Sequence, residues 1–382
     1  MSNYPTIITT EKRAANIPAL AWSDTSRIAI IGDYPDERDL DYGYALCGSA
    51  GDFLSRVLHD VGINRRACYI GNVYPWRVHH PSQIKPERLA EGVAQLRVDL
   101  EKFSPNIIVG LGQTTLSELR PKADIKGFRG SLFHGSSFGS GFKCITSQHP
   151  RDVLAAYELF PLLKFDLKRA ADESRSPSLV LPQREINIDL GADALVQLMD
   201  GWPSGQRCSI DIEGGLPSDC VNSAVKADSK RRKYIGWRCV SLAGRSTRAF
   251  TITWSRLSDP DKVQVLRSFA RLMCRGDVPK VLQNSLYDNF VLSYGYGIPI
   301  TPVVEDTMLK GWEIYCELPK GLATQASIYT RQPHWKDDDM YQSDGDGLAH
   351  GCGLDSSVTL EICENQDSIL KGPARAHYRT NM

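Results

Sequence analysis

The chain has 382 residues, of which 42% are hydrophobic and 24% are charged, and its formal net charge is zero. This is an ordinary globular balance, with apolar material for more than one core and a length that fits two or three domains. Zero net charge excludes a strongly basic protein that holds polyanions through its overall charge, although phosphate binding needs only a local basic face. No apolar run approaches the ~20 residues that a membrane span requires, so no membrane partner is expected.

Ten cysteines are spread along the sequence, and no two of them form a CxxC pair. Several lie in apolar or strand-like stretches. We interpret them as reduced, mostly buried thiols rather than as disulfides or zinc ligands. Because no secretory signal is recognisable near the first residues, we expect a cytoplasmic protein.

Strands alternate with helices in the first half of the chain. Strands are predicted at 27–33, 67–73, 106–112 and 142–150, and long helices at 50–62 and 86–103. This alternation predicts an α/β domain with a mostly parallel sheet covered on both faces. Ligands of such sheets bind outside the carboxyl ends of the strands. Those ends carry Asp33, Asn72, Gly112 and His149.

A change of composition separates the two halves. Residues 171–185 are polar, contain proline and have no periodicity, which is typical of a linker. After them we predict strands at 207–213, 234–243 and 248–254, and helices at 192–200, 259–275 and 286–295. The expected organisation is an N-terminal extension at 1–26, a first domain at 27–170, this linker, and a second domain at 186–382.

Six short motifs in the first domain follow one another at the predicted strand ends. They are GDYPDERD (32–39), GSAGDFL (48–54), GNVYPWR (71–77), LGQTTLSEL (111–119), FRG (128–130) and SQHPRDVL (147–154). Over about residues 27–170 the chain thereby resembles the uracil-DNA glycosylase superfamily. The resemblance implies a three-layer α/β/α fold that binds DNA. It also implies that Asp33 positions a water, Asn72 reads a flipped base and His149 stabilises charge on the leaving uracil.

The first domain also departs from this family pattern at three positions. Leu46 stands where an aromatic residue should stack on the base, a contact worth ~1–3 kcal/mol. Tyr34 and Arg151 stand where small residues are usual. The iron–sulfur cysteines of some relatives are missing, so no iron–sulfur cluster is expected. Two alternatives stay open: an active uracil-DNA glycosylase, or a module that grips DNA without cutting glycosidic bonds.

The stretch CSIDIEGG (208–215) places two acids in a strand that otherwise looks buried. Side chains alternate along a strand, so Asp211 and Glu213 point to one face and Ile210 and Ile212 to the other. Ionised carboxylates beside a core require a positive partner. Two acids at this spacing can share a divalent cation. The alternative is a pair of solvated acids on an edge strand, because this pattern is common.

Further acids follow in suitable settings. QNSLYDNFVL (283–292) presents Asn284 and then Asp288 at the start of a predicted helix, and CGLDSSVTLEI (352–362) places Asp355 at the head of another. The intervening LPKGL and SIYT…WKDD stretches lie within 303–338. Together these features resemble the proofreading 3′–5′ exonuclease domain, with four acidic residues, of phage-type family A DNA polymerases. The resemblance covers about residues 205–382 and implies a ribonuclease H-like α/β fold with a mixed sheet.

This second resemblance implies metal-dependent hydrolysis of DNA. Asp211, Glu213, Asp288 and Asp355 would hold two Mg²⁺ ions, with Mn²⁺ as a substitute, because hard cations take carboxylate oxygens. The substrate would be a single-stranded 3′ end, such as that of a primer–template. Gly351 stands where a water-orienting tyrosine is usual. His350 has the H-x4-D spacing of a related branch and could act as general base; the alternatives are Tyr341 or no residue.

Basic, aromatic and amide side chains are candidates for the strand-binding groove. The candidates are Asn284, Tyr287, Lys320, Trp335 and Lys336. The run KRRKYIGWR (230–238) interleaves charges with Tyr234 and Trp237 but can equally be a solvated loop. Asp306 is interpreted as structural. Phosphate contacts of this kind would make binding depend on salt.

The final residues look like the run from a proofreading domain into the next helix of a polymerase. We therefore expect either the N-terminal part of a larger replicative polymerase or a protein that works beside a polymerase subunit, in a bacterial or phage-infected cytoplasm. The competing functions are a non-catalytic DNA-binding accessory module with vestigial acids, and an active uracil-DNA glycosylase of DNA repair.

Overall fold

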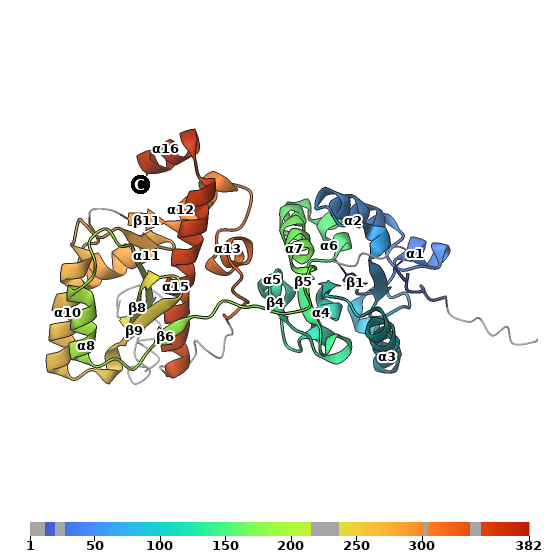
Figure 1. The fold of residues 1–382 in the computed structure, drawn as a ribbon, viewed down its shortest axis with the longest axis horizontal. Coiled ribbons are helices and arrows are strands. Elements are labelled where there is room, and N and C mark those ends of the chain that lie inside the picture. Colours follow the sequence, from blue (N-terminus) through green and yellow to red (C-terminus); the bar gives the residue numbers. More distant parts are fainter. Residues whose placement is uncertain (1–11, 20–26, 215–236, 302–303, 337–344, 382) are drawn as a thin grey trace, which may run out of the picture. The chain divides into compact units, whose positions relative to one another are not determined.

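The computed structural model describes residues 12–19, 27–214, 237–301, 304–336 and 345–381. The chain forms two compact units, which divide after Leu181 (Figure 1). Across the described residues, no helix is both long enough and apolar enough to cross a membrane.

A five-stranded sheet forms the centre of the first unit. Its strands are β1 (Ile28–Gly32), β2 (Tyr69–Asn72), β3 (Ile107–Leu111), β4 (Leu132–His134) and β5 (Lys143–Ser147). Their order is β2-β1-β3-β5-β4, and neighbouring strands are parallel except β4 and β5, which are antiparallel. The carboxyl ends of the four parallel strands therefore share one edge of the sheet.

Helices cover both faces of this sheet (Figure 1). They are α1 (Glu37–Tyr42), α2 (Ser49–Asp60), α3 (Pro86–Phe103), α4 (Gln113–Leu119), α5 (Ile125–Phe128), α6 (Pro150–Ala155) and α7 (Phe160–Glu173). Successive side chains of β1 point to opposite faces of the sheet, so the strand contributes to the core on each face. Ile28 and Ile30 pack with α2, α6 and α7, whereas Ala29 and Ile31 pack with α3 and α4. The predicted three-layer arrangement with a mostly parallel sheet is confirmed.

A buried lysine fixes the chain that leaves α7. The side chain of Lys143 on β5 is 1% exposed. Its ammonium donates to the Glu173 carboxylate at 3.0 Å and to the main-chain oxygens of Glu173, Ser176 and Ser178 at 2.8, 2.7 and 3.1 Å. Leu181 packs a few residues later against the core of the same unit. The segment 171–185, expected to be a linker, thus begins inside α7 and is held along much of its length.

A six-stranded mixed sheet forms the centre of the second unit. Its strands are β6 (Glu185–Asn187), β7 (Cys208–Gly214), β8 (Trp237–Arg245), β9 (Arg248–Thr253), β10 (Lys280–Leu282) and β11 (Val304–Asp306). Their order is β11-β10-β7-β8-β9-β6, with β8 antiparallel to both of its neighbours and the other pairs parallel. The predicted α/β fold with a mixed sheet is confirmed for this unit.

Helices also cover both faces of the second sheet. They are α8 (Ala192–Asp200), α10 (Asp259–Met273), α11 (Ser285–Phe290), α12 (Thr307–Ile314), α13 (Leu322–Tyr329), α15 (Asp346–Ile369) and α16 (Gly372–Asn381), with a π-helical turn at Val291–Gly295. Helices α8 and α10 share a core with the apolar face of β7 to β9, and α15 packs on the opposite face (Figure 1).

Arg184 anchors the first residues of the second unit to the rest of that unit. Its guanidinium pairs with Glu361 of α15 and donates to the Ser357 hydroxyl at 3.0 Å and to the Gln332 amide oxygen at 2.9 Å. The Arg184 side chain is only 3% exposed. The contacts of Leu181 with one unit and of Arg184 with the other leave Pro182 and Gln183 between the two anchor points.

The Lys143 contact generates a stability prediction. Lys143→Met removes the buried ammonium that donates to the Glu173 carboxylate and to three main-chain oxygens, so the free energy of unfolding of the first unit should fall by about 3–5 kcal/mol. The double variant Lys143→Met/Glu173→Gln should recover part of this loss, because it no longer buries the carboxylate charge that the ammonium offset. Urea denaturation measures both. Equal losses in the single and the double variant would contradict a paired role for these side chains.

Candidate functional site

Contacts between α15 and the sheet bring three acids of the second unit together. The hydroxyl of Ser241 donates to the Cys352 carbonyl at 2.6 Å, and that of Thr251 to the Ala349 carbonyl at 2.8 Å. These bonds hold the start of α15 on β8 and β9, and β8 lies next to β7, the strand that carries Asp211 and Glu213. One carboxylate oxygen from each of Asp211, Glu213 and Asp355 lies within 4.8 Å of the others. The predicted common face of Asp211 and Glu213 is therefore the face that α15 covers.

Asp288 reaches the neighbourhood of this group from α11. It is 5% exposed and lies outside the group of three. Its helix begins where the Asp306 carboxylate accepts from the backbone N–H groups of Ser285 at 2.7 Å and Met308 at 2.7 Å. Asp306 thus ties the first turns of α11 and α12 together, in keeping with its interpretation as structural.

The carboxylates of the cluster have raised pKa values, because they have little contact with water and lie close together. Burial raises the pKa of Asp211 well above its usual range, and the charges of Asp355, Glu213 and Asp288 raise it further. Burial, together with the charge of Asp355, raises the pKa of Glu213 to about 7. Burial likewise raises the pKa of Asp288. The cluster therefore favours any cation that can enter it.

Two neighbouring side chains contact Asp355. The indole Nε1 of Trp335 donates to Oδ1 at 2.7 Å, and the Lys336 ammonium donates to Oδ2 at 2.6 Å. Trp335 is 6% exposed and packs with α13 and α15. The sequence pointed to both residues as DNA contacts. The structure gives them positions beside the carboxylates, and their contact with DNA stays a prediction.

The oxygen ligands that the cluster offers suit a hard divalent cation. All of the clustered ligands are carboxylate oxygens, the atoms that Mg²⁺ and Mn²⁺ prefer. Oδ2 of Asp211 is buried and has no hydrogen-bond partner among the described residues. A buried carboxylate oxygen without a donor is costly, and coordination of a cation would satisfy it.

The other sequence-predicted residues of this unit lie in varied surroundings. His350 is exposed on α15, five residues before Asp355. Tyr287 lies on α11 and is 47% exposed. Asn284 directly precedes this helix and has a positive φ of 62°. The Lys320 ammonium donates to main-chain oxygens of Tyr315 and Leu318. Trp237 is 5% exposed in the core, whereas Tyr234 and Tyr341 lie outside the described residues.

The first unit carries a second polar cluster at the carboxyl edge of its sheet. Asp33, after β1, is 8% exposed, and its Oδ1 accepts from the backbone N–H of Thr115 at 2.7 Å and from its hydroxyl at 2.9 Å. Gly112 has a φ of +100°, and a Cβ there would collide with the Asp33 carboxylate. Burial, opposed in part by the Thr115 hydrogen bonds, raises the pKa of Asp33 to about 6. Thr115 lies within the LGQTTLSEL motif, but its contact with Asp33 joins residues 82 positions apart and could not be predicted from local patterns.

Asn72 and His149 converge on Gly32. A Cβ on Gly32 would lie 2.8 Å from the Asn72 Oδ1, 3.2 Å from the His149 Nε2 and 3.5 Å from the Leu46 Cδ1. Among the described residues, no hydrogen-bond partner satisfies the Asn72 amide or the His149 Nε2, although all three atoms are buried. Such unsatisfied groups are unusual in a protein core and indicate a site for a polar ligand.

The protonation state of His149 follows from its contacts. Burial, with the nearby charge of Arg151, lowers the pKa of His149 to about 3, so the ring is neutral. Its Nδ1 accepts from the backbone N–H of Arg151 at 3.2 Å. The proton of the neutral ring therefore lies on Nε2, which points a donor toward the space beside Asn72.

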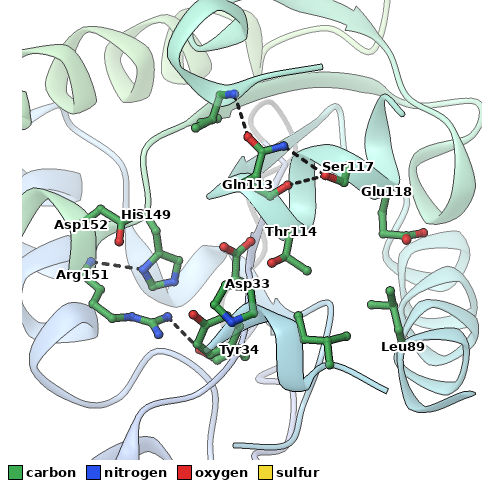
Figure 2. Close-up of a pocket in the computed structure, with 13 residues that line it drawn as sticks. Asp33, Tyr34, Leu89, Gln113, Thr114, Ser117, Glu118, His149, Arg151 and Asp152 are labelled. Atoms are coloured by element: carbon green, nitrogen blue, oxygen red, sulfur yellow. Dashed lines mark hydrogen bonds between the residues drawn. The ribbon is translucent and has the colours of Figure 1, made fainter. Parts of the chain in front are cut away.

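A pocket of about 430 Å³ opens beside Asp33 and His149. Figure 2 shows the Arg151 side chain folded over Tyr34, close to the His149 ring. The guanidinium lies 4.3 Å from the centre of the Tyr34 ring and donates to the Tyr34 carbonyl at 3.1 Å. Two of the three residues that depart from the family pattern, Tyr34 and Arg151, thus form a pair at this pocket. Leu46 is 1% exposed and lies beside Gly32 rather than along this pocket.

The raised pKa of Asp33 makes the stability of the first unit depend on pH. The folded unit holds the Asp33 proton up to about pH 6, whereas the unfolded chain releases it near 3.8, so ionisation costs stability as pH rises between these values. Asp33→Asn can keep both hydrogen bonds from Thr115 and has no charge to lose. Its gain in melting temperature over the wild type should grow from pH 4 to pH 6 and then level off. Calorimetry across this range tests the prediction, and a constant difference would contradict it.

Solved structures similar to the chain include nucleases and a polymerase. The POL domain of Pol1 from M. smegmatis in complex with a DNA primer-template and dNTP is 15% identical, covers 52% of this chain and 29% of that chain, and gives a TM-score of 0.36. Escherichia coli RNase D, an exoribonuclease involved in structured RNA processing, is 14% identical, covers 52% of this chain and 49% of that chain, and gives a TM-score of 0.37.

Sequence comparisons match the first unit. The model of the uracil DNA glycosylase superfamily matches residues 21–172. The type-4 uracil-DNA glycosylase of Archaeoglobus fulgidus is 26% identical over 155 residues, which are 39% of this chain and 78% of that protein. The type-4 uracil-DNA glycosylase of Thermotoga maritima is 31% identical over 149 residues, which are 38% of this chain and 76% of that protein. With this identity over three quarters of a relative, the chain belongs, through its first unit, to the uracil DNA glycosylase superfamily.

Proposed function

We propose that the second unit is a divalent-metal-dependent 3′–5′ DNA exonuclease, joined to a DNA-binding first unit in a phage-type replication polymerase or beside one. One observation carries this proposal. Three acids from a strand and a facing helix, with Asp355 buried and Asp211 and Glu213 half-buried, present oxygens within 4.8 Å of one another, and one buried oxygen of Asp211 has no partner among the described residues. The likeness of residues 303–338 to phage-type proofreading domains supports the choice of DNA and of a replicative role.

Each residue at the acidic cluster has a distinct role in the proposed hydrolysis. Asp211, Glu213 and Asp355 would hold the cations, with Asp288 beside them. Bound Mg²⁺ or Mn²⁺ would supply Lewis-acid activation of the attacking water and stabilisation of the charge on the leaving oxygen. Trp335 fixes the orientation of the Asp355 carboxylate through its 2.7 Å hydrogen bond. His350, exposed on the same helix as Asp355, is the proposed proton acceptor. Exposed Tyr287 is available to stack on a terminal base.

A labelled primer–template tests the nuclease. With Mg²⁺, the wild-type chain should shorten a 5′-labelled primer stepwise from its 3′ end, and Asp211→Ala/Glu213→Ala should abolish this activity because the metal ligands are lost. EDTA should have the same effect. Asp346→Ala removes an exposed acid from the same helix and should leave the rate unchanged.

The same assay tests His350. His350→Ala should lower the rate at least tenfold if this side chain accepts the proton, which is within the range that general-base catalysis contributes. An unchanged rate would assign water activation to another group. DNA binding without any shortening would favour the accessory-module function over the enzyme.

A second activity, removal of uracil by the first unit, is favoured by the unsatisfied amide of Asn72 and the Nε2 donor of His149. Asn72 can read the edge of a flipped base, and the neutral His149 can donate to the oxygen that gains charge as the base leaves. Asp33 can position the attacking water once it is ionised.

The pKa of Asp33 gives this second activity a measurable signature. The rate of uracil release should fall about tenfold per pH unit below pH 6, as Asp33 becomes protonated. His149, whose pKa is about 3, should add no step in this range. Counting abasic sites in a uracil-containing duplex measures the rate, with Asn72→Ala as the inactive variant. If no abasic sites form at any pH, the first unit does not remove uracil and is a DNA-binding module without glycosylase activity.

A further inference from the structure

Lys336 differs from the other lysines buried near carboxylates in this protein. The side chains of Lys143 and Lys310 are each 1% exposed and enclosed by several acceptors. The side chain of Lys336 is 32% exposed, although the Asp355 carboxylate that it contacts is only 2% exposed. The ammonium can therefore leave Asp355 for solvent without opening a core.

The two donors on Asp355 lie at different depths. Trp335 is packed in the core cluster with Leu354 and Val358 and holds Oδ1. Lys336 holds Oδ2 at 2.6 Å from the partly open side. A cation that coordinates the Asp355 oxygen facing the open side must therefore share it with the ammonium or displace the ammonium.

The charge of Lys336 also reaches the rest of the cluster. It acts on Asp211 and Glu213 as well as on Asp355. The interaction of two charges at this range is several-fold stronger in a partly buried site than in water. The positive charge of Lys336 beside Asp211, Glu213 and Asp355 therefore weakens the attraction of the cluster for a divalent cation.

We propose that Lys336 is a built-in competitor for divalent metal at Asp355, which keeps metal affinity low until a nucleic-acid phosphate draws the ammonium away. This inference rests on the proposed nuclease function and adds a regulatory property to its site. A phosphate oxygen offers the ammonium a replacement acceptor, so nucleic acid and metal each strengthen the binding of the other. Such coupling is reciprocal by thermodynamic necessity.

Metal affinity without nucleic acid provides the test. Mn²⁺ binding to the full chain is measured by electron paramagnetic resonance and by the Mn²⁺-induced shift in melting temperature. Lys336→Gln, which keeps a hydrogen-bond donor but has no charge, should bind Mn²⁺ at least tenfold more tightly than the wild type. Lys336→Arg keeps the charge and should resemble the wild type. Trp335→Phe removes a neutral donor from Asp355 and should not tighten binding.

The coupling is tested with a phosphorothioate single-stranded oligonucleotide. Its addition should tighten Mn²⁺ binding to the wild type at least tenfold and change that of Lys336→Gln by much less. If Lys336→Gln binds Mn²⁺ as the wild type does, or more weakly, Lys336 is a scaffold residue and the inference is wrong. If neither the wild type nor the variants bind Mn²⁺ at all, the proposed metal-dependent nuclease fails together with the inference.

Discussion

The second unit depends on one constraint, which is that three carboxylates, with that of Asp288 in the neighbourhood, must be held close together with little exposure to water. Their own chemistry opposes this arrangement, as the raised pKa values of Asp211, Glu213 and Asp288 record. The cluster is imposed by contacts elsewhere, namely hydroxyl groups of the sheet that hold main-chain oxygens at the start of α15. The hydrogen bonds between the sheet and α15 therefore hold the carboxylates together against their mutual repulsion. Positive charge beside them, from Lys336 or from a bound metal, would reduce that repulsion.

The first unit meets a related constraint with neutral groups instead of charges. The Asn72 amide and the His149 Nε2 are buried without partners among the described residues, and the missing side chain of Gly32 leaves the space on which they converge. Polar groups held in this way are already oriented before a ligand arrives, which is the arrangement that favours selective binding. In the first unit these groups lie at the carboxyl ends of strands, whereas in the second unit Asp211 and Glu213 lie within β7 and Asp355 lies on α15.

Local sequence patterns predicted the features that depend on local periodicity. The alternation at 208–213 placed Asp211 and Glu213 on one face, and the apolar spacing of 86–103 and 192–200 gave the bounds of α3 and α8 as the structure has them. The patterns could not predict contacts that only the folded chain creates, such as Thr115 with Asp33, Arg151 with Tyr34, and Lys336 with Asp355. Strands β4 and β6 are three residues long, which is too short for periodicity to appear.

The two anchor points at the junction have a kinetic consequence. Between Leu181, packed on the first unit, and Arg184, locked into the second, only Pro182 and Gln183 intervene, so this piece of backbone spans about 11 Å at most. A tether of this length gives each unit an effective concentration on the order of millimolar near the other. Under the functions proposed above, a DNA strand released by one unit would be recaptured by the same molecule far more often than by another, and the two units would act on one strand in sequence rather than in separate encounters.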